Sequence, residues 1–136
     1  MKTLSTIAVG FDGSHDAKTA VRWAFNLANH VDAKVVVVHA VGMLGRFEDR
    51  SNEKELEESV HELCDDCGID RSRVRLHVTN GDACSVLMRM AEDPISADLL
   101  VVGSRGQGKH PGLLLGSTSL ELAEHTTVPL VIVPSL

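Results

Sequence analysis

The stretch LLVVGSRGQGKHPGLLLGSTS, residues 99–119, joins an apolar run to several glycines and ends in three hydroxyl residues. The apolar run, Asp98–Gly103, is short and rich in β-branched residues, which is typical of a buried β-strand. A helix is predicted from Ser117 to about His125, with Thr118 and Glu121 spaced as in a capping box. A strand that runs through glycines into a helix start is typical of a phosphate-binding segment.

Four further runs have the same character as Asp98–Gly103, and each predicts a strand. They are Thr6–Phe11, Ala33–Val41, Arg73–Val78 and Pro129–Val133. Several of them are apolar on both faces, which is typical of a parallel sheet that is covered by helices on both sides.

Between these runs, apolar residues recur three or four positions apart, which predicts amphipathic helices. Such spacing extends from Ala17 to Ala28, from Leu56 to Cys67 and from Ala83 to Ala91. Strands and helices therefore alternate along the whole chain, which predicts an α/β fold with a single doubly wound parallel sheet of five strands. With 136 residues, 43% of them hydrophobic, the chain is expected to form one domain over residues 1–136.

Composition restricts the partners and the compartment. The net charge is −6 and no long Lys or Arg run occurs, so neither nucleic acid nor an anionic membrane surface is expected as a partner. The N-terminus lacks the apolar core of a signal peptide and no stretch approaches a membrane span, which predicts a cytoplasmic protein. An odd, small number of cysteines predicts reduced thiols rather than a disulfide framework: Cys64, Cys67 and Cys84.

The glycine segment does not match two common nucleotide motifs. Gly103, Gly108 and Lys109 have the Walker A spacing, but His110 stands where that motif needs a hydroxyl for Mg²⁺. Pro111 then delays the helix whose amides would face the phosphates. A dinucleotide fingerprint is also excluded, because no G-x-G-x-x-G opens a helix after the first strand.

A longer spacing does fit, namely Gly103-x2-Gly106-x9-Gly116-Ser117. Glycines let the backbone pass close to a ligand, and the hydroxyls and amides of residues 117–119 could hold a phosphate chain. An ordinary glycine-rich turn before an N-capped helix explains the same spacing. The residues alone leave both interpretations open.

Asp12, directly after the first strand, is a second candidate. Ligands of open α/β sheets bind beyond the carboxyl ends of the strands, where the strand order reverses. If the first and fourth strands are neighbours, Asp12 and Gly103 share one crevice, where Asp12 could contact a ribose or a metal-bound phosphate. Alternatively, Asp12 caps the first helix together with Ser14.

Four segments together resemble the ATP-binding class of the universal stress protein family. They are IAVGFDGS (7–14), VVVVHAV (35–41), the long glycine motif and VPLVIVP (128–134). The resemblance implies a Rossmann-like open sheet with strand order 3-2-1-4-5 and helices on both faces. It also implies a homodimer that pairs through the last strand, Val128 to Val133.

The same resemblance implies an ATP site, with Mg²⁺ or Mn²⁺ accompanying the nucleotide. The nucleoside end would be lined by Gly10, Phe11, Asp12 and the backbone of Ala40. The loop over ribose and phosphates would contain Val102, Gly103, Arg105 and Gly106. The phosphate tail would lie against Gly116, Ser117, Thr118 and Ser119.

Three functions follow from these expectations. The first is a regulatory, stress-response protein in which bound ATP changes a loop or the surface for a protein partner of unknown identity. The second is a weak ATPase or an enzyme that slowly phosphorylates Ser117 or Ser119, although no clear general base is present and Lys109 and His110 are expected to be solvated. The third is a dimeric interaction protein that binds no nucleotide.

Other features have simpler interpretations. The spacing of His61, Cys64 and Cys67 resembles metal ligation, but on a helix these side chains diverge around the surface. His39 is predicted to be a core or sheet-face residue, and Cys84 either packs or is a reactive thiol. The irregular segment Gly42 to Ser51 is either a plain surface connection or a mobile flap.

Overall fold

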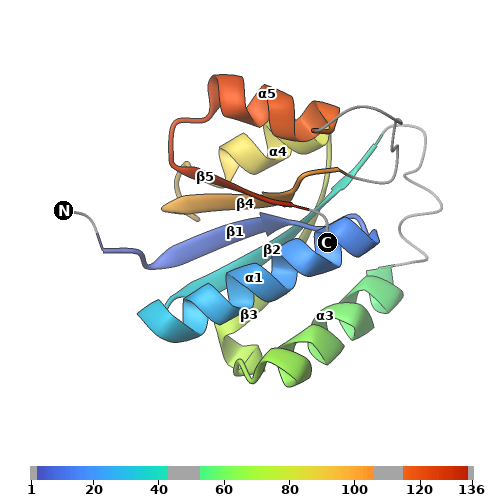
Figure 1. Ribbon diagram of the computed structural model, residues 1–136, viewed down its shortest axis with the longest axis vertical. Helices are drawn as coiled ribbons and strands as arrows, with labels where there is room; N and C mark the ends of the chain where they lie inside the picture. The colour runs from blue at the N-terminus through green and yellow to red at the C-terminus, as the bar shows by residue number, and fades with distance from the viewer. Residues whose placement is uncertain (1–2, 43–52, 106–114, 135–136) are drawn as a thin grey trace.

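The computed structural model describes residues 3–42, 53–105 and 115–134. Strands and helices alternate along the described chain (Figure 1). The elements are β1 (Thr6–Gly10), α1 (His15–Val31), β2 (Lys34–Val41), α3 (Glu53–Cys67), the 3₁₀ turn η1 (Arg71–Arg73), β3 (Val74–Asn80), α4 (Ala83–Arg89), β4 (Leu99–Gly103), α5 (Ser117–His125) and β5 (Leu130–Val133).

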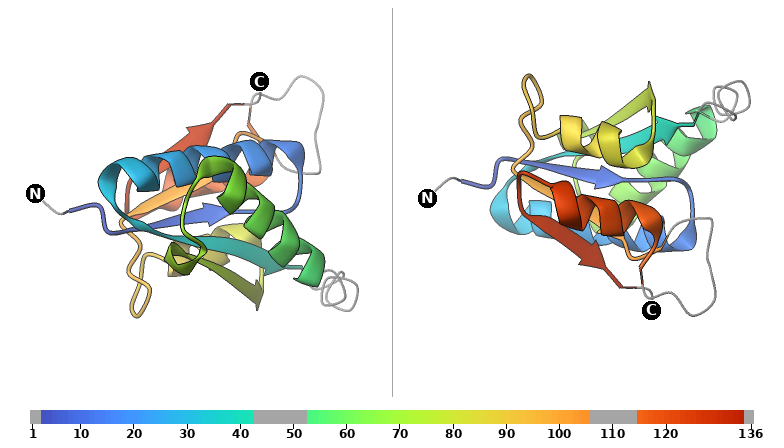
Figure 2. Two further views of the ribbon diagram at one scale, coloured as in Figure 1. Left: turned by 90° about the horizontal axis from the view of Figure 1, so that it is seen from below. Right: turned by 90° about the horizontal axis from the view of Figure 1, so that it is seen from above.

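The five strands form one parallel sheet in the order β3-β2-β1-β4-β5, which confirms the predicted fold. Helices α1 and α3 pack on one face of the sheet, and α4 and α5 pack on the other (Figure 2). The chain moves from β1 outward to β3 on one side, then returns to add β4 and β5 on the other. The strand order therefore reverses between β1 and β4.

Two hydrophobic clusters fill the space between the sheet and its helices. Ile7 and Val9 of β1 belong to the cluster under α1 and α3, whereas Ala8 belongs to the cluster under α4 and α5. This alternation follows from the period of two in a strand. The apolar face predicted for the first helix is buried throughout: Ala17, Ala20, Val21, Ala24, Phe25 and Ala28.

Several predicted boundaries shift by one or two residues. Phe11 lies beyond β1, Arg73 belongs to η1 rather than to β3, and β3 continues to Asn80. The predicted capping box is wrong, because α5 begins at Ser117 with Gly116 as its N-cap residue, so that Thr118 lies inside the helix. Interactions that are made after folding, rather than the apolar period, set these ends.

The basic residues around position 73 serve the fold. The Nη2 of Arg73 donates to the carbonyl oxygens of Ala28, at 2.8 Å, and Ala33, at 2.6 Å. These acceptors lie at the carboxyl end of α1, where a positive charge is favourable. Arg71 forms an ion pair with Asp65 at 2.8 Å. Within the described ranges, no helix has both the length and the apolar composition that a membrane span needs.

Candidate functional site

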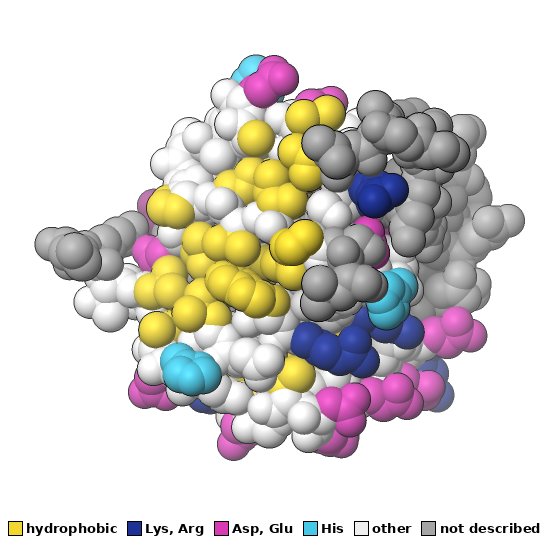
Figure 3. Space-filling view, viewed as in Figure 1, with side chains coloured by type: hydrophobic (Ala, Val, Ile, Leu, Met, Phe, Trp, Pro, Cys, Tyr) yellow, Lys and Arg dark blue, Asp and Glu magenta, His cyan; other side chains and the backbone are white. Residues whose placement is uncertain are grey.

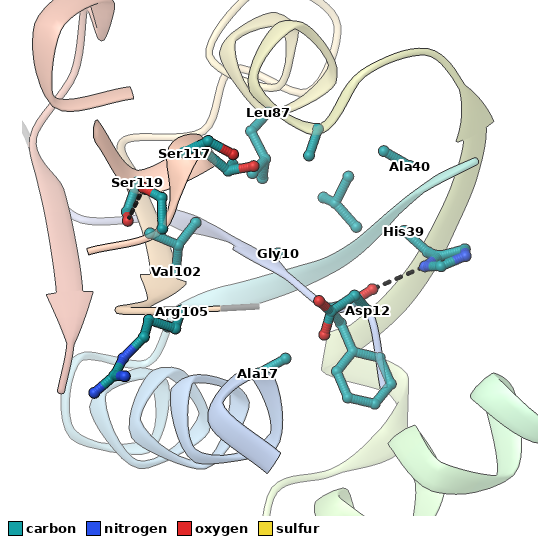
Figure 4. Close-up of a pocket in the computed structure, with 16 residues that line it drawn as sticks. Gly10, Asp12, Ala17, His39, Ala40, Leu87, Val102, Arg105, Ser117 and Ser119 are labelled. Atoms are coloured by element: carbon teal, nitrogen blue, oxygen red, sulfur yellow. Dashed lines mark hydrogen bonds between the residues drawn. The ribbon is translucent and has the colours of Figure 1, made fainter. Parts of the chain in front are cut away.

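A cavity of about 350 Å³ opens beyond the carboxyl ends of β1, β2 and β4 (Figure 4). It lies at the reversal of strand order, where α/β sheets usually bind their ligands. The residues that line it come from β1, β2, β4, the loops that follow β1 and β4, the amino-terminal parts of α1 and α5, and helix α4.

The structure brings eleven of the twelve predicted site residues to this cavity. They are Gly10, Phe11, Asp12, Ala40, Val102, Gly103, Arg105, Gly116, Ser117, Thr118 and Ser119. The twelfth, Gly106, lies outside the described residues, as do Lys109, His110 and residues 43–52. Segments that are about a hundred positions apart in the sequence therefore line the same cavity.

The cavity has five further lining residues that the sequence did not indicate. They are Ala17, Val38, His39, Ala83 and Leu87. Leu87 lies within the predicted helical run from Ala83 to Ala91, but nothing in this spacing shows that α4 packs beside β1. His39 follows the pattern of a buried strand residue, and its position at the end of β2 is the one signal that could have suggested the site.

His39 connects two walls of the cavity. It is buried, and its Nδ1 lies 2.9 Å from the carbonyl oxygen of Phe11, so this nitrogen donates the proton. Because Phe11 precedes Asp12, the bond fixes the end of β2 to the loop that carries the acidic residue. The prediction that His39 is a core or sheet-face residue agrees with its burial, but it did not include the place of His39 in the cavity wall.

The loop from β1 to α1 uses both of its polar side chains. The amide of Ser14 donates to Oδ1 of Asp12 at 2.9 Å, and Oγ of Ser14 accepts from the amide of Ala17 at 3.2 Å. Ser14 is therefore the N-cap of α1, and Asp12 stabilises the turn before it. Gly13 between them has a φ of +83°, which favours glycine. Asp12 lines the cavity as well.

Gly103 is required by packing between elements. A Cβ atom at this position would lie 2.9 Å from the carbonyl oxygen of Asp16 in the first turn of α1. The expected reason for this glycine was close passage of a ligand, whereas its near neighbour is the backbone of α1. At Gly10 the added atom would meet a side chain, at 3.2 Å from Cδ1 of Leu87.

The amino terminus of α5 forms the wall opposite Ala40 and His39 (Figure 4). Gly116 is the N-cap residue of α5, and it has no side chain that could accept hydrogen bonds from the first amides of the helix. Ser117 is exposed and Thr118 is partly exposed, whereas Ser119 is buried. This wall combines amide donors, two accessible hydroxyls and the positive end of the helix dipole.

Arg105 adds a positive charge at the edge of the cavity. Its Nε is buried and has no hydrogen-bond partner among the described residues. Figure 4 shows its side chain extending away from Asp12 and His39. Arg105 therefore extends from the end of β4 away from the wall formed by β2.

The thiols are not activated. Burial, together with the nearby Glu121 carboxylate, raises the pKa of Cys84 to about 11. Burial also raises the pKa of Cys64 to about 11. Both thiols are thus protonated at neutral pH, and packing is the better interpretation of Cys84. Among the described residues, no group of three or more His, Cys, Asp or Glu side chains is arranged to hold a metal ion.

Comparison with known proteins gives one consistent match. The model of the universal stress protein family matches residues 3–134. A universal stress protein of Mycobacterium tuberculosis is 29% identical over 139 residues, which cover 98% of this chain and 49% of the relative. A putative universal stress protein of Staphylococcus aureus is 25% identical, with 98% and 86% covered. The chain thus spans about half the length of its mycobacterial relatives.

Solved structures share the fold. A universal stress protein in complex with cAMP has 27% identity and a TM-score of 0.74, with 97% of this chain and 98% of that chain covered. The universal stress protein of Lactobacillus plantarum has 16% identity and a TM-score of 0.82, covering 98% and 99%. The protein from Archaeoglobus fulgidus in complex with dAMP has 20% identity and a TM-score of 0.74, covering 96% and 98%.

Proposed function

This chain belongs to the universal stress protein family, and we propose that it is an ATP-binding regulatory protein of the stress response. ATP occupies the cavity beyond β1 and β4, and its presence changes the surface offered to a protein partner. The names of two structural neighbours state that they bind cAMP and dAMP, which supports an adenine nucleotide as the ligand class.

The observation that carries this proposal is that one part of the cavity is apolar and another part is rich in hydrogen-bond donors. Val38, Ala40, Ala83 and Leu87 give one part of the cavity an apolar lining, which suits a base. The uncapped start of α5 gives another part a cluster of donors, which suits phosphate oxygens. ATP has the same division between an apolar ring and an anionic tail.

Asp12 is the acidic residue among those that line the described cavity. One carboxylate is enough for Mg²⁺ bound to a nucleotide, because this ion usually keeps several waters and takes its other ligands from the phosphates. The donor set therefore fits ATP accompanied by Mg²⁺ or Mn²⁺, with Asp12 as the residue that would face the metal.

Calorimetric titration of the nucleotide-free protein with ATP and Mg²⁺ tests the proposal. We expect saturable binding of one ATP per chain, competition by cAMP, and weaker binding of GTP. Release of inorganic phosphate from the same mixture measures turnover, which we expect to be slow or undetectable. Absence of heat and of competition, in protein shown to be folded, would favour the interaction protein that binds no nucleotide.

We also propose a homodimer that forms through β5 and the adjoining Val128. β5 is an edge strand whose one neighbour in the described sheet is β4. Leu130, Val131 and Ile132 of β5 are only partly buried, and Figure 3 shows an extended hydrophobic surface on the face where Figure 1 places β5. Unpaired edges and apolar patches of this kind are usually covered by another chain.

Sedimentation equilibrium measures this assembly directly. We expect a mass of twice the 14.6 kDa of the chain at micromolar concentration. A second copy would supply the missing backbone partners of β5 and cover the apolar surface. A single-chain mass at tens of micromolar protein would contradict the dimer without affecting the proposal for ATP.

A further inference from the structure

We propose that Ser119 is a positioning residue, which holds the start of α5 against the end of β4 and does not itself bind phosphate. The inference rests on the proposed ATP site, in which residues 117–119 would all face the phosphate tail. Of the three hydroxyl residues, Ser117 and Thr118 can bind a ligand, whereas the hydroxyl of Ser119 already forms hydrogen bonds within the protein.

The first argument is the hydrogen bonding of Ser119. Its side chain is 2% exposed, and its Oγ lies 3.2 Å from the carbonyl oxygen of Ser104 and 3.0 Å from that of Gly116. Both neighbours are acceptors, so the hydroxyl donates to them. A serine hydroxyl has a single proton, and a phosphate oxygen also needs a donor. Ser119 cannot serve the two carbonyls and a phosphate at once.

The second argument is the position of Ser104. Its carbonyl oxygen also accepts from the amide of Gly116 at 2.7 Å, and its own amide donates to the carbonyl oxygen of Val133 at 2.9 Å. Ser104 is therefore fixed to β5 on one side and to the N-cap of α5 on the other. Through this residue, the helix start is attached to the sheet.

This attachment sets the direction of the free amides. The hydroxyl of Ser119 and the amide of Gly116 hold one turn of α5 at two points on the same carbonyl. Loss of one point leaves the turn free to tilt, so that the amides of Ser117 and Thr118 no longer converge on one place. A preorganised anion site binds more tightly because this ordering is complete before the ligand arrives.

Two measurements on Ser119→Ala test the inference. In the ligand-free protein we expect the amides of Gly116 and Leu120 to exchange with solvent roughly tenfold faster, as the loss of one buried hydrogen bond implies. We expect ATP to bind roughly tenfold more weakly and adenosine within about twofold of the wild type, because only the phosphate end is disturbed.

Two further variants serve as controls. Ser119→Thr keeps the hydroxyl and is expected to restore both amide exchange and ATP affinity. Ser117→Ala removes an accessible hydroxyl and is expected to weaken ATP binding without changing exchange in the ligand-free protein. These opposite patterns distinguish a residue that positions the helix from one that contacts the ligand.

The outcomes separate this inference from the proposed function. Weaker ATP binding by Ser119→Ala with unchanged exchange would make Ser119 a phosphate ligand and overturn the inference. Unchanged exchange with unchanged affinity would overturn it as well. If the wild-type protein binds no ATP, the proposed function fails, while amide exchange in Ser119→Ala still decides whether Ser119 holds the helix start.

Discussion

Replacement of Ser117 by proline is expected to weaken ATP binding about 100-fold while the fold is retained. The change removes one amide donor and one hydroxyl from the start of α5, and each hydrogen bond to a charged group contributes about 1.5–3 kcal/mol. Proline is tolerated at the first position of a helix because its φ is suitable and its missing amide has no helical acceptor. The extended backbone of Gly116, with ψ of 168°, also suits a residue before proline.

Calorimetric titrations of Ser117→Pro with ATP and with adenosine measure this effect. Adenosine affinity is expected to stay within about twofold, because the altered wall would face the phosphates. Ser117→Ala is the matched control, since it keeps the amide, and its loss is expected to be about tenfold. Equal affinities of Ser117→Pro and the wild type for ATP would show that the phosphates do not lie at the start of α5.

Replacement of Gly103 by alanine is expected to lower the free energy of unfolding by about 2–3 kcal/mol. The new methyl group would lie 2.9 Å from the carbonyl oxygen and 3.0 Å from the carbonyl carbon of Asp16. Both are backbone atoms in the first turn of α1, so no side-chain rotation relieves the contact. Either α1 or β4 must shift, and each packs into the same buried cluster.

Urea denaturation of Gly103→Ala beside Gly42→Ala checks this expectation. Gly42 is exposed, and an added Cβ there meets nothing within 4 Å, so its replacement is expected to change stability by less than about 0.5 kcal/mol. A shift of α1 would also move Asp12 through the short loop between β1 and α1. Equal stabilities of the two variants would show that α1 does not pack against β4 as described.

Much of the fold follows from local patterns. The apolar face from Ala17 to Ala28 lies within α1, and the helix predicted from Ser117 to His125 has those bounds in the structure. Such patterns are readable because each helix or strand must bury one face or both, and the period of that burial is a local property of the chain. The capping box at Thr118 was wrong because several hydroxyls in a row offer alternative starts.

The site was predictable only in part. Spacing alone left open whether Gly116 and Asp12 meet, and only the resemblance implied that they share one site. His39 and Leu87 were not indicated, because a residue at the end of one strand and a residue on one helix share a wall only after the sheet is assembled. Ser119 was assigned with its neighbours, and its hydrogen bonds to Ser104 and Gly116 give it a different role.

The type, the order and the apolar faces of the helices and strands can be predicted from the amino-acid sequence, since these properties depend on residues within a few positions of one another. Three contacts can be seen only in the assembled fold: α1 packs on Gly103, His39 bonds to the loop of Asp12, and Ser104 anchors α5. Each of these contacts joins segments that are distant in the chain. The geometry of these contacts depends on the register of the sheet and on the packing of the helices. Many residues each make a small contribution to register and packing, so the spacing of a few neighbouring residues does not predict these contacts.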